Sequence, residues 1–357
     1  MVTSSDAVLA FFLAALIAWA TVPLAENFAR RVGAIDTPGP RSQHLAPTPR
    51  MSGLAILAGI EIAGWIWLPS SNQGTAILLG AVAVAFVGAL DDVFELGALQ
   101  KLLGQIVAAT IPVVAGVRPD VLTLPFIGGF DLGWAAYPLT IIGIVAVVNI
   151  VNLMDGIDGL AAGVVAIAAT AMAIIALSLE RYEAGLLAAV TAGGALGYLR
   201  HGFPPASSFM GDTGSNLLGY MIAVTSIQGA LKTNAVVALA FPLVILAVPI
   251  LDTAFVVAKR LKYHQPIYQA DRWHFHHRMA NKGFSQRRTL AYLYGWTFVL
   301  ALLALALRFV PYSDDHGHFE LGWTLLMAIV ILAAVGVSAY LVYVLEIIKL
   351  RRTDSGP

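Results

Sequence analysis

Two amides and two carboxylates follow one another in a short stretch of the chain that long apolar segments flank on both sides. The stretch reads Asn149-Ile-Val-Asn152-Leu-Met-Asp155-Gly-Ile-Asp158-Gly. Helical spacing places Asn149, Asn152 and Asp155 along one face at the end of the preceding helix, and the glycines let the chain turn. Polar groups at a membrane boundary cost free energy unless they are paired or functional. We therefore expect a site here, with helix capping as the alternative.

A second acidic pair, Asp91-Asp92, precedes Lys101. Adjacent carboxylates repel each other unless a cation neutralises them, so the pair implies a positive partner. Lys101 begins the next apolar segment, where an ammonium near the membrane surface can meet an anionic head group. An N-cap for the following helix is the alternative explanation of the pair.

Asp212 lies between two glycines in Phe209-Met-Gly-Asp-Thr-Gly-Ser-Asn216. Glycine lets the backbone approach a ligand closely, and the helix that follows would direct its amide dipole at the same place. A carboxylate beside an anion site needs a metal between them, and carboxylate and amide oxygens suit a hard ion such as Mg²⁺. The motif favours a metal-assisted anion site, with an ordinary turn as the alternative.

Two basic segments complete the candidate groups. The longer one, residues 259–289, contains Asp271-Arg272-Trp-His274-Phe-His276-His277-Arg278. A zinc site is disfavoured because thiolates and the His-Glu-x-x-His spacing are missing, and the many donors match phosphate oxygens better. The shorter one, residues 36–50, is Pro-rich and carries Arg41 and His44, which also suit phosphate. A simple orientation signal is the alternative there.

These groups must be held at a membrane, because the chain is 59% hydrophobic and only 12% charged. Soluble domains carry about twice that share of charged residues. With about 20 apolar residues per span, the sequence predicts an all-α polytopic membrane protein of about eleven transmembrane helices. We expect them near residues 7–26, 51–69, 74–90, 102–118, 134–151, 158–179, 184–199, 214–230, 235–258, 290–310 and 322–346. The chain, 1–357, is expected to be one integral membrane domain, and the first span is expected to be retained.

Charge placement predicts the orientation. If the amino terminus is outside, all but four of the 21 basic residues fall on one side; the exceptions are Arg118, Arg181, Lys232 and Arg308. The positive-inside rule makes that side cytoplasmic, with the carboxyl terminus and its tail, 347–357. Every candidate group above then lies on the cytoplasmic face. Outside, the Gly-centred alternation near 121–133 predicts a small β-hairpin.

Composition also limits the partners. The net charge is zero, so no net field attracts nucleic acid, and without cysteine there is no disulfide or cysteine nucleophile. Small-residue pairs such as Gly193-Gly194 would permit a homodimer.

Taken together, the motifs resemble those of the polyprenyl-phosphate N-acetylhexosamine-1-phosphate transferases, in particular the WecA/TagO-like branch. The resemblance runs from about residue 32 to 288 and rests on Asp91-Asp92, Asn-Leu-Met-Asp-Gly-Ile-Asp-Gly, Phe-Met-Gly-Asp and Asp-Arg-Trp-His-Phe-His-His-Arg. It implies transfer of a hexosamine 1-phosphate, most simply GlcNAc 1-phosphate, from a UDP-sugar to undecaprenyl or decaprenyl phosphate. UMP would leave, a cell-envelope glycan would begin, and the enzyme would lie in a prokaryotic plasma membrane and need Mg²⁺, with Mn²⁺ as a substitute.

The resemblance also implies roles for residues. Asp212 and Asn152 would bind the metal, and the catalytic carboxylates would be Asp91, Asp92 and Asp155. Substrate contacts would come from Lys101, Asn149, Asp158, Arg41, His44, Arg272, His274, His276 and His277. Direct attack by the lipid phosphate and a two-step path through an aspartyl-phosphate both stay open.

Two alternatives remain. A phospho-N-acetylmuramoyl-pentapeptide transferase is disfavoured because Glu95 stands where that branch has lysine. A membrane transporter would more often place its polar groups near the middle of the membrane and alternate access between both faces.

Overall fold

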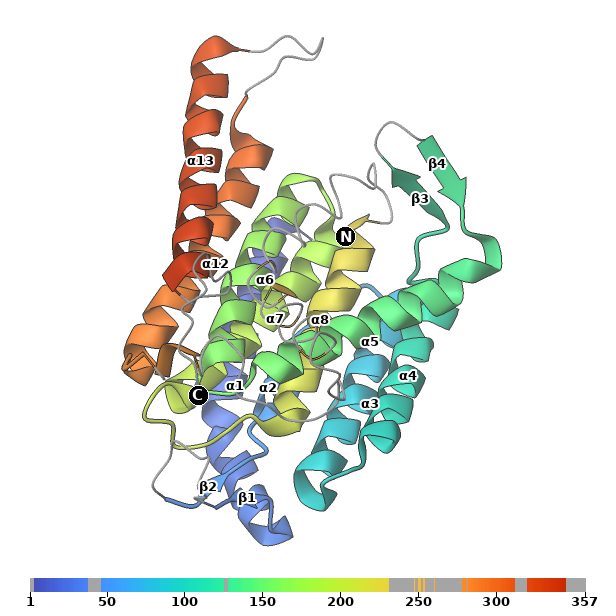
Figure 1. The fold of residues 1–357 in the computed structure, drawn as a ribbon. Helices are drawn as coiled ribbons and strands as arrows, with labels where there is room; N and C mark the ends of the chain where they lie inside the picture. The colour runs from blue at the N-terminus through green and yellow to red at the C-terminus, as the bar shows by residue number, and fades with distance from the viewer. Residues whose placement is uncertain are drawn as a thin grey trace.

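The computed structural model of the protein describes residues 3–37, 46–124, 128–230, 278–280, 282–311 and 320–344, with residues 247, 250, 251, 253 and 260. These residues form a bundle of long α-helices with two short hairpins (Figure 1). Six expected site residues lie outside the described residues: Arg41, His44, Arg272, His274, His276 and His277.

The described helices follow the expected apolar segments closely. They are α1 (Ser4–Val32), α2 (Gly53–Trp67), α3 (Asn72–Phe94), α4 (Ala98–Val114), α5 (Ala136–Met154), α6 (Leu160–Ser178), α7 (Tyr182–Gly202), α8 (Gly211–Ala230), α12 (Gln286–Phe309) and α13 (Leu321–Val344). Among the described residues, six of these helices are long and apolar enough to cross a membrane: α1, α3, α5, α6, α12 and α13. A multi-pass helical membrane protein is therefore confirmed, whereas the count of eleven spans and their orientation stay predictions.

Local sequence explains where several helices begin and end. Thr3 and Asp6 form a capping box at the start of α1, and Gly33 ends that helix in the left-handed region with φ 81°. The Ser71 side chain accepts from the backbone N–H of Gly74 and so caps α3. The helix α12 begins at Gln286, within the basic segment that was expected to extend to residue 289.

Small residues let the helices approach closely in the half of the bundle built from α1, α2, α6 and α7. A Cβ on Gly193 or Gly197 would collide with backbone oxygens of α1, and one on Gly194 would lie 3.2 Å from Ile56 of α2. The pair Gly193-Gly194 thus packs helices of a single chain. Our expectation that it offers a dimer surface was wrong, because this face of α7 is already covered.

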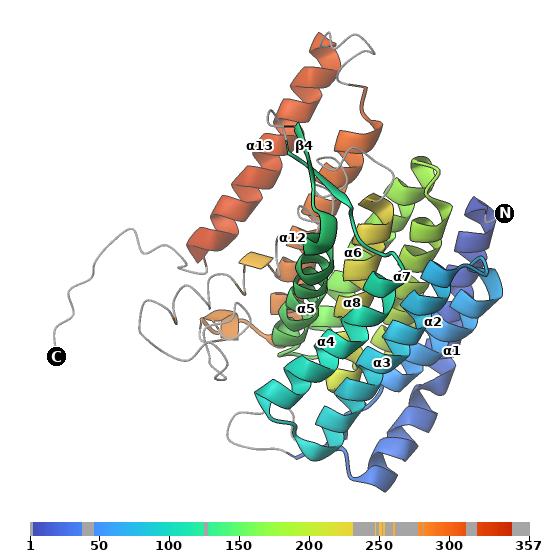
Figure 2. The same ribbon diagram turned by 90° about the vertical axis from the view of Figure 1, so that its right-hand side faces the viewer.

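The other half is organised around α8, which packs against α3, α5 and α7. A Cβ on Gly219 of α8 would lie only 2.7 Å from the Cα of Val148 in α5, so these two backbones lie against each other. At the edge of the bundle, α13 packs on α12 (Figure 2). This arrangement brings the ends of α3, α4, α5 and α8 together.

The two hairpins lie at opposite ends of the bundle (Figure 1). Strand β3 (Val121–Leu124) pairs with β4 (Gly128–Asp131) in antiparallel register, which confirms the predicted hairpin; the 3₁₀ turn η1 (Gly133–Ala135) follows. At the other end, β1 (Ile35–Asp36) pairs with β2 (Thr48–Pro49). We call the end with β3 and β4 the hairpin end and the end with β1 and β2 the site end.

Candidate functional site

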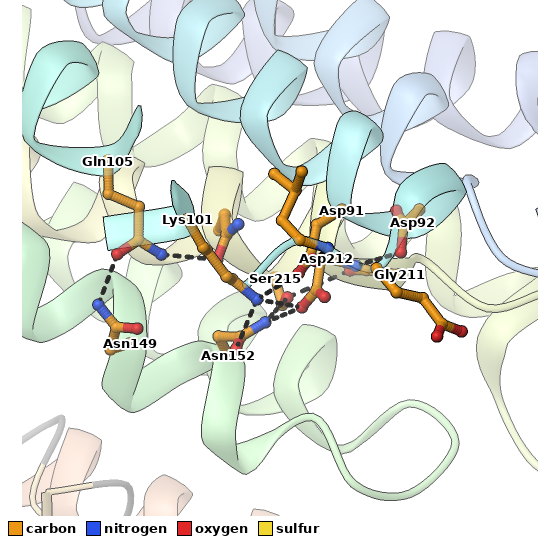
Figure 3. Close-up of polar contacts among 12 residues, drawn as sticks. Asp91, Asp92, Lys101, Gln105, Asn149, Asn152, Gly211, Asp212 and Ser215 are labelled. Atoms are coloured by element: carbon orange, nitrogen blue, oxygen red, sulfur yellow. Dashed lines mark hydrogen bonds and ion pairs between the residues drawn. The ribbon is translucent and has the colours of Figure 1, made fainter. Parts of the chain in front are cut away.

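Four helix ends meet at the site end and carry a cluster of charged and amide side chains (Figure 3). Lys101 lies in the first turn of α4, Asn152 in the last turn of α5 and Asp212 in the first turn of α8. Asp91 lies in the last turn of α3; we expected it just after that helix, but the helix continues to Phe94. We call Asp91, Lys101, Asn152 and Asp212 the charged cluster.

Lys101 stands at the centre of the charged cluster. Its Nζ lies 2.8 Å from Asp91 Oδ2 and 3.0 Å from Asp212 Oδ1, and it donates to Asn152 Oδ1 at 3.3 Å. Both carboxylates are largely shielded from water, so these ion pairs are screened less than surface pairs. The positive partner that the acidic pair implied is therefore Lys101.

Asn152 of α5 is hydrogen-bonded to two side chains in the first turns of α8. Its Nδ2 donates to Asp212 Oδ1 and, at 2.8 Å, to the hydroxyl of Ser215, which in turn donates to the carbonyl of Gly211 at 3.1 Å. Asp212 thus receives both the ammonium and the amide on one carboxylate oxygen. The amide fixes the side chain of Asp212 relative to the start of α8.

Asp91 pairs with Lys101, whereas Asp92 is hydrogen-bonded to the start of α8. Its carboxylate accepts the backbone N–H of Asp212 at 2.9 Å and of Thr213 at 3.0 Å, and the hydroxyl of Thr213 at 2.6 Å (Figure 3). The alternative of a cap for the next helix was thus half correct, because Asp92 caps α8 instead of α4. It also means that the first amides of α8, which we expected to face a ligand, are engaged by Asp92.

The end of the Pro-rich segment is hydrogen-bonded to the residues that precede Asp212. The N–H of Phe209 donates to the carbonyl of Pro49 at 2.9 Å, and the N–H of Ser52 donates to the carbonyl of Phe209 at 3.0 Å. The Arg50 guanidinium donates twice to the carbonyl of Asp92, at 2.9 and 3.1 Å. We expected Arg50 only as part of the basic, phosphate-binding segment, because nothing in its spacing shows that it closes the end of α3.

The turn between α5 and α6 holds the remaining two carboxylates. Gly159 has φ 75°, as the predicted turn requires, and its carbonyl accepts the hydroxyl of Tyr294 at 2.5 Å. Asp158 accepts the N–H of Ala206 at 3.2 Å. Within the described part of the chain, the partly buried carboxylate of Asp155 has no hydrogen-bond or ion-pair partner. Burial, together with the negative charge of Asp212, raises the pKa of Asp155 well above its usual range.

Asn149 lies deeper than the charged cluster. Its Nδ2 donates to Gln105 Oε1 at 2.7 Å and to the carbonyl of Val145 at 2.8 Å. Sequence reasoning missed Gln105, and it quoted Asn216 as the end of a motif without giving it a role. The signal that could have found them is their position four residues after Lys101 and Asp212, on the same helix faces.

The donor set suits a hard divalent cation. In the described ranges, no three carboxylate or imidazole side chains are placed to hold a metal by themselves. The carboxylates of Asp91 and Asp212 nevertheless share one ammonium, which leaves negative charge in excess, and the amide of Asn152 adds oxygen. Oxygen donors of this kind are preferred by Mg²⁺. The residues present therefore fit such an ion.

Comparison with known proteins agrees with the architecture of this site. The model of glycosyl transferase family 4 matches residues 75–230, which include the charged cluster and Asp92, Asp155 and Asp158. A probable undecaprenyl-phosphate N-acetylglucosaminyl 1-phosphate transferase of Bacillus subtilis is 38% identical over 84% of this chain and 85% of its own length. The chain belongs to glycosyl transferase family 4.

Other relatives cover both branches of this family. A decaprenyl-phosphate N-acetylglucosaminephosphotransferase of Mycobacterium tuberculosis is 34% identical over 84% of this chain and 82% of the relative. A phospho-N-acetylmuramoyl-pentapeptide-transferase of Desulforamulus reducens is 32% identical over 83% of this chain and 93% of the relative. The family resemblance expected from the motifs is thus confirmed.

Proposed function

We propose that this family member transfers GlcNAc 1-phosphate from UDP-GlcNAc to a polyprenyl phosphate and releases UMP. The observation that carries the proposal is the charged cluster, in which one lysine, two carboxylates and one amide from four helix ends converge at the site end of an apolar bundle. The names of the Bacillus and Mycobacterium relatives support this transferred group and this acceptor. The muramoyl relative of Desulforamulus reducens is 32% identical, against 38% for the Bacillus subtilis relative, and this difference favours the GlcNAc branch.

Lys101 is placed to receive the lipid phosphate. Leu99 and Leu103, its neighbours on α4, have exposed side chains, so the helix presents an apolar surface to lipid next to the ammonium. A polyprenyl chain can lie along that surface while its phosphate reaches Lys101 Nζ. The phosphate then replaces the Asp91 or Asp212 carboxylate as the partner of the ammonium.

Asp212 and Asn152 are the residues that would hold Mg²⁺, which when bound would neutralise the diphosphate of the donor. Asp92 and Arg50 support the same site by holding the helix ends that carry its side chains. Asp92 fixes the first turn of α8, and Arg50 fixes the last turn of α3, so Asp212 and Asp91 stay aligned. The turn with Asp155 and Asp158 borders the same space and is available to the nucleotide.

The reaction needs little proton transfer. A phosphate monoester has a second pKa near 6 and is mostly dianionic at neutral pH, so the acceptor can attack without an obligatory base. Its oxygen forms a bond to the sugar-linked phosphorus, the bond from that phosphorus to the bridging oxygen breaks, and UMP leaves with the bridging oxygen. Because the oxygens of Asp92 are engaged with α8, a base role suits it poorly.

We place the site end on the cytoplasmic face of a prokaryotic plasma membrane. The support is the distribution of basic residues, which leaves only Arg118, Arg181, Lys232 and Arg308 for the other side. The soluble nucleotide sugar is then on the same side as the charged cluster.

The test is UMP release by purified, detergent-solubilised protein with undecaprenyl phosphate and UDP-GlcNAc, with Mg²⁺ and with EDTA. We expect release that needs both the lipid and the cation. Release with UDP-GalNAc or with UDP-N-acetylmuramoyl-pentapeptide instead of UDP-GlcNAc would keep the reaction class and change the branch. Failure with every donor would overturn the proposal and favour the transporter.

A further inference from the structure

A second layer of polar side chains lies one helical turn deeper than the charged cluster. It consists of Gln105, Asn149 and Asn216, which we call the amide layer (Figure 3 labels the first two). Asn149 Nδ2 donates to Gln105 Oε1 at 2.7 Å, and Gln105 Nε2 donates to Asn216 Oδ1 at 3.4 Å. The hydrogen bonds therefore connect α5 to α4 and α4 to α8.

Each member of the amide layer lies one helical turn deeper than a member of the charged cluster on the same helix. Gln105 follows Lys101 by four residues, Asn216 follows Asp212 by four, and Asn149 precedes Asn152 by three. Residues at these separations lie on one face of a helix, one turn apart. The three helices that supply the ammonium, the amide and the carboxylate of the site are thus tied together one turn below those groups.

The cost of this layer argues for a role beyond filling the bundle. Gln105 and Asn216 are 1% and 0% exposed, in helices that are otherwise apolar. Within the described residues, Asn216 Nδ2 has no hydrogen-bond partner, so no hydrogen bond offsets the cost of burying this amide nitrogen. Apolar residues of the same size would pack there at lower cost. Retaining amides makes sense where they fix helix rotation and register.

We propose that the amide layer positions the charged cluster: it locks the rotation of α4, α5 and α8 so that Lys101, Asn152 and Asp212 keep the separations that the transfer needs. Gln105 is the central positioning residue because it contacts both other members. A small rotation of α4 would carry the Lys101 ammonium away from Asp212. This inference rests on the proposed function.

The test is the double variant Gln105→Leu/Asn216→Leu. It removes both partners of the α4–α8 hydrogen bond and also the uncompensated Asn216 amide, while Asn149 keeps the carbonyl of Val145. Replacing both partners by apolar groups of similar size is nearly neutral for stability. The matched control is Thr191→Val, which removes a fully buried hydroxyl of α7 that bonds only within its own helix.

Three readouts are compared in the wild type, the double variant and the control: thermal stability (Tm), steady-state kinetics (KM and kcat) and a distance between helices. We expect the double variant to keep its Tm and its KM for UDP-GlcNAc and to lose about 10- to 100-fold in kcat, the usual cost of removing outer support from a site. The third readout needs no turnover. Because the protein has no cysteine, spin labels at Leu99→Cys on α4 and Leu153→Cys on α5 report the helix separation alone, and we expect a broader distance distribution in the double variant.

A double variant with wild-type kcat and a wild-type distance distribution would overturn the inference. Parallel losses of Tm and kcat would also overturn it, because they would show ordinary structural damage. If the wild-type protein released no UMP, the proposed function would fail, and the distance distribution alone would then decide whether the amide layer sets the helix positions.

Discussion

The two ends of α3, α4 and α8 both carry amide and charged side chains, but these side chains are paired differently at each end. At the hairpin end, Gln228 of α8 donates to Gln73 of α3 at 3.3 Å and to Glu183 of α7 at 3.1 Å. Arg118, just beyond α4, lies 3.6 Å from Asp120 and 4.2 Å from the ring of Tyr137. Arg118 is thus paired with groups at its own end of the bundle.

At the site end, the same helices bring the carboxylates of Asp91 and Asp212 to Lys101, and the side chain of Asp155 has no partner among the described residues. One helical turn deeper, amides connect α4 to α5 and to α8. The difference indicates that the hairpin end is built for stability, whereas the site end keeps negative charge that an added cation and a phosphate can complete. The predictions below test this contrast.

The largest effect is expected for Asp212→Asn. The amide keeps the size of the side chain and an oxygen for Lys101, but it removes the charge that the transfer needs. We expect kcat to fall about 10³-fold, as when a principal electrostatic group of an active site is removed. The measurement is UMP release at saturating lipid and donor. Arg118→Met, at the hairpin end, is the control, and equal activity in both variants would contradict the contrast.

A smaller loss is expected for Asp92→Asn, because Asp92 acts through the start of α8. The new NH₂ group would face the N–H donors of Asp212 and Thr213. We expect about a tenfold loss of kcat, a lower Tm from a cap worth about 1 kcal/mol, and an unchanged shape of the pH–rate profile. A residual rate that rose with pH more steeply than in the wild type would instead favour a base role for Asp92.

Asp155→Asn should stabilise the protein in the absence of divalent cations. Since the fold raises the pKa of Asp155, its folded state is penalised once the carboxyl ionises. The penalty is absent below the ordinary Asp pKa of about 4 and grows as the pH rises toward the raised value. We expect the variant to exceed the wild type in Tm by a few degrees at pH 8 in EDTA, and by less at pH 5. The same gain at both pH values would show that charge is not the cause.

The smallest effect is expected at the hairpin end, for Gln228→Met. It removes hydrogen bonds to Gln73 and Glu183. We expect a loss of at most about 1 kcal/mol in stability, measured by thermal unfolding, and no change in kcat. A clear loss of turnover without a loss of Tm would mean that the two ends are coupled.

Much of this molecule was predictable from its sequence because apolar length and glycine position are local signals. The spans expected to end near residues 151 and 199 end at Met154 and Gly202, and the turn at Gly159 and the pairing of β3 with β4 followed from these signals. The motifs also named the members of the charged cluster. These signals depend only on the residues of each segment and not on its partners elsewhere in the chain.

Partners between distant segments were not predictable in the same way. Adjacent Asp91 and Asp92 look equivalent in sequence, yet one meets Lys101 and the other caps α8, because helix rotation sends neighbouring side chains about 100° apart. The partners of Arg50 and Gln105 were not predictable, since each side chain contacts a helix far away in the chain. Likewise, Gly193 looked like a dimer contact until α1 was seen to cover it.

The central claim is that the site end transfers a sugar 1-phosphate, so the most direct measurement is the mass of both products formed from UDP-GlcNAc and undecaprenyl phosphate. The account predicts UMP together with a lipid diphosphate that carries one GlcNAc. UDP together with a lipid monophosphate carrying GlcNAc would contradict it, because the sugar would then have moved without its phosphate.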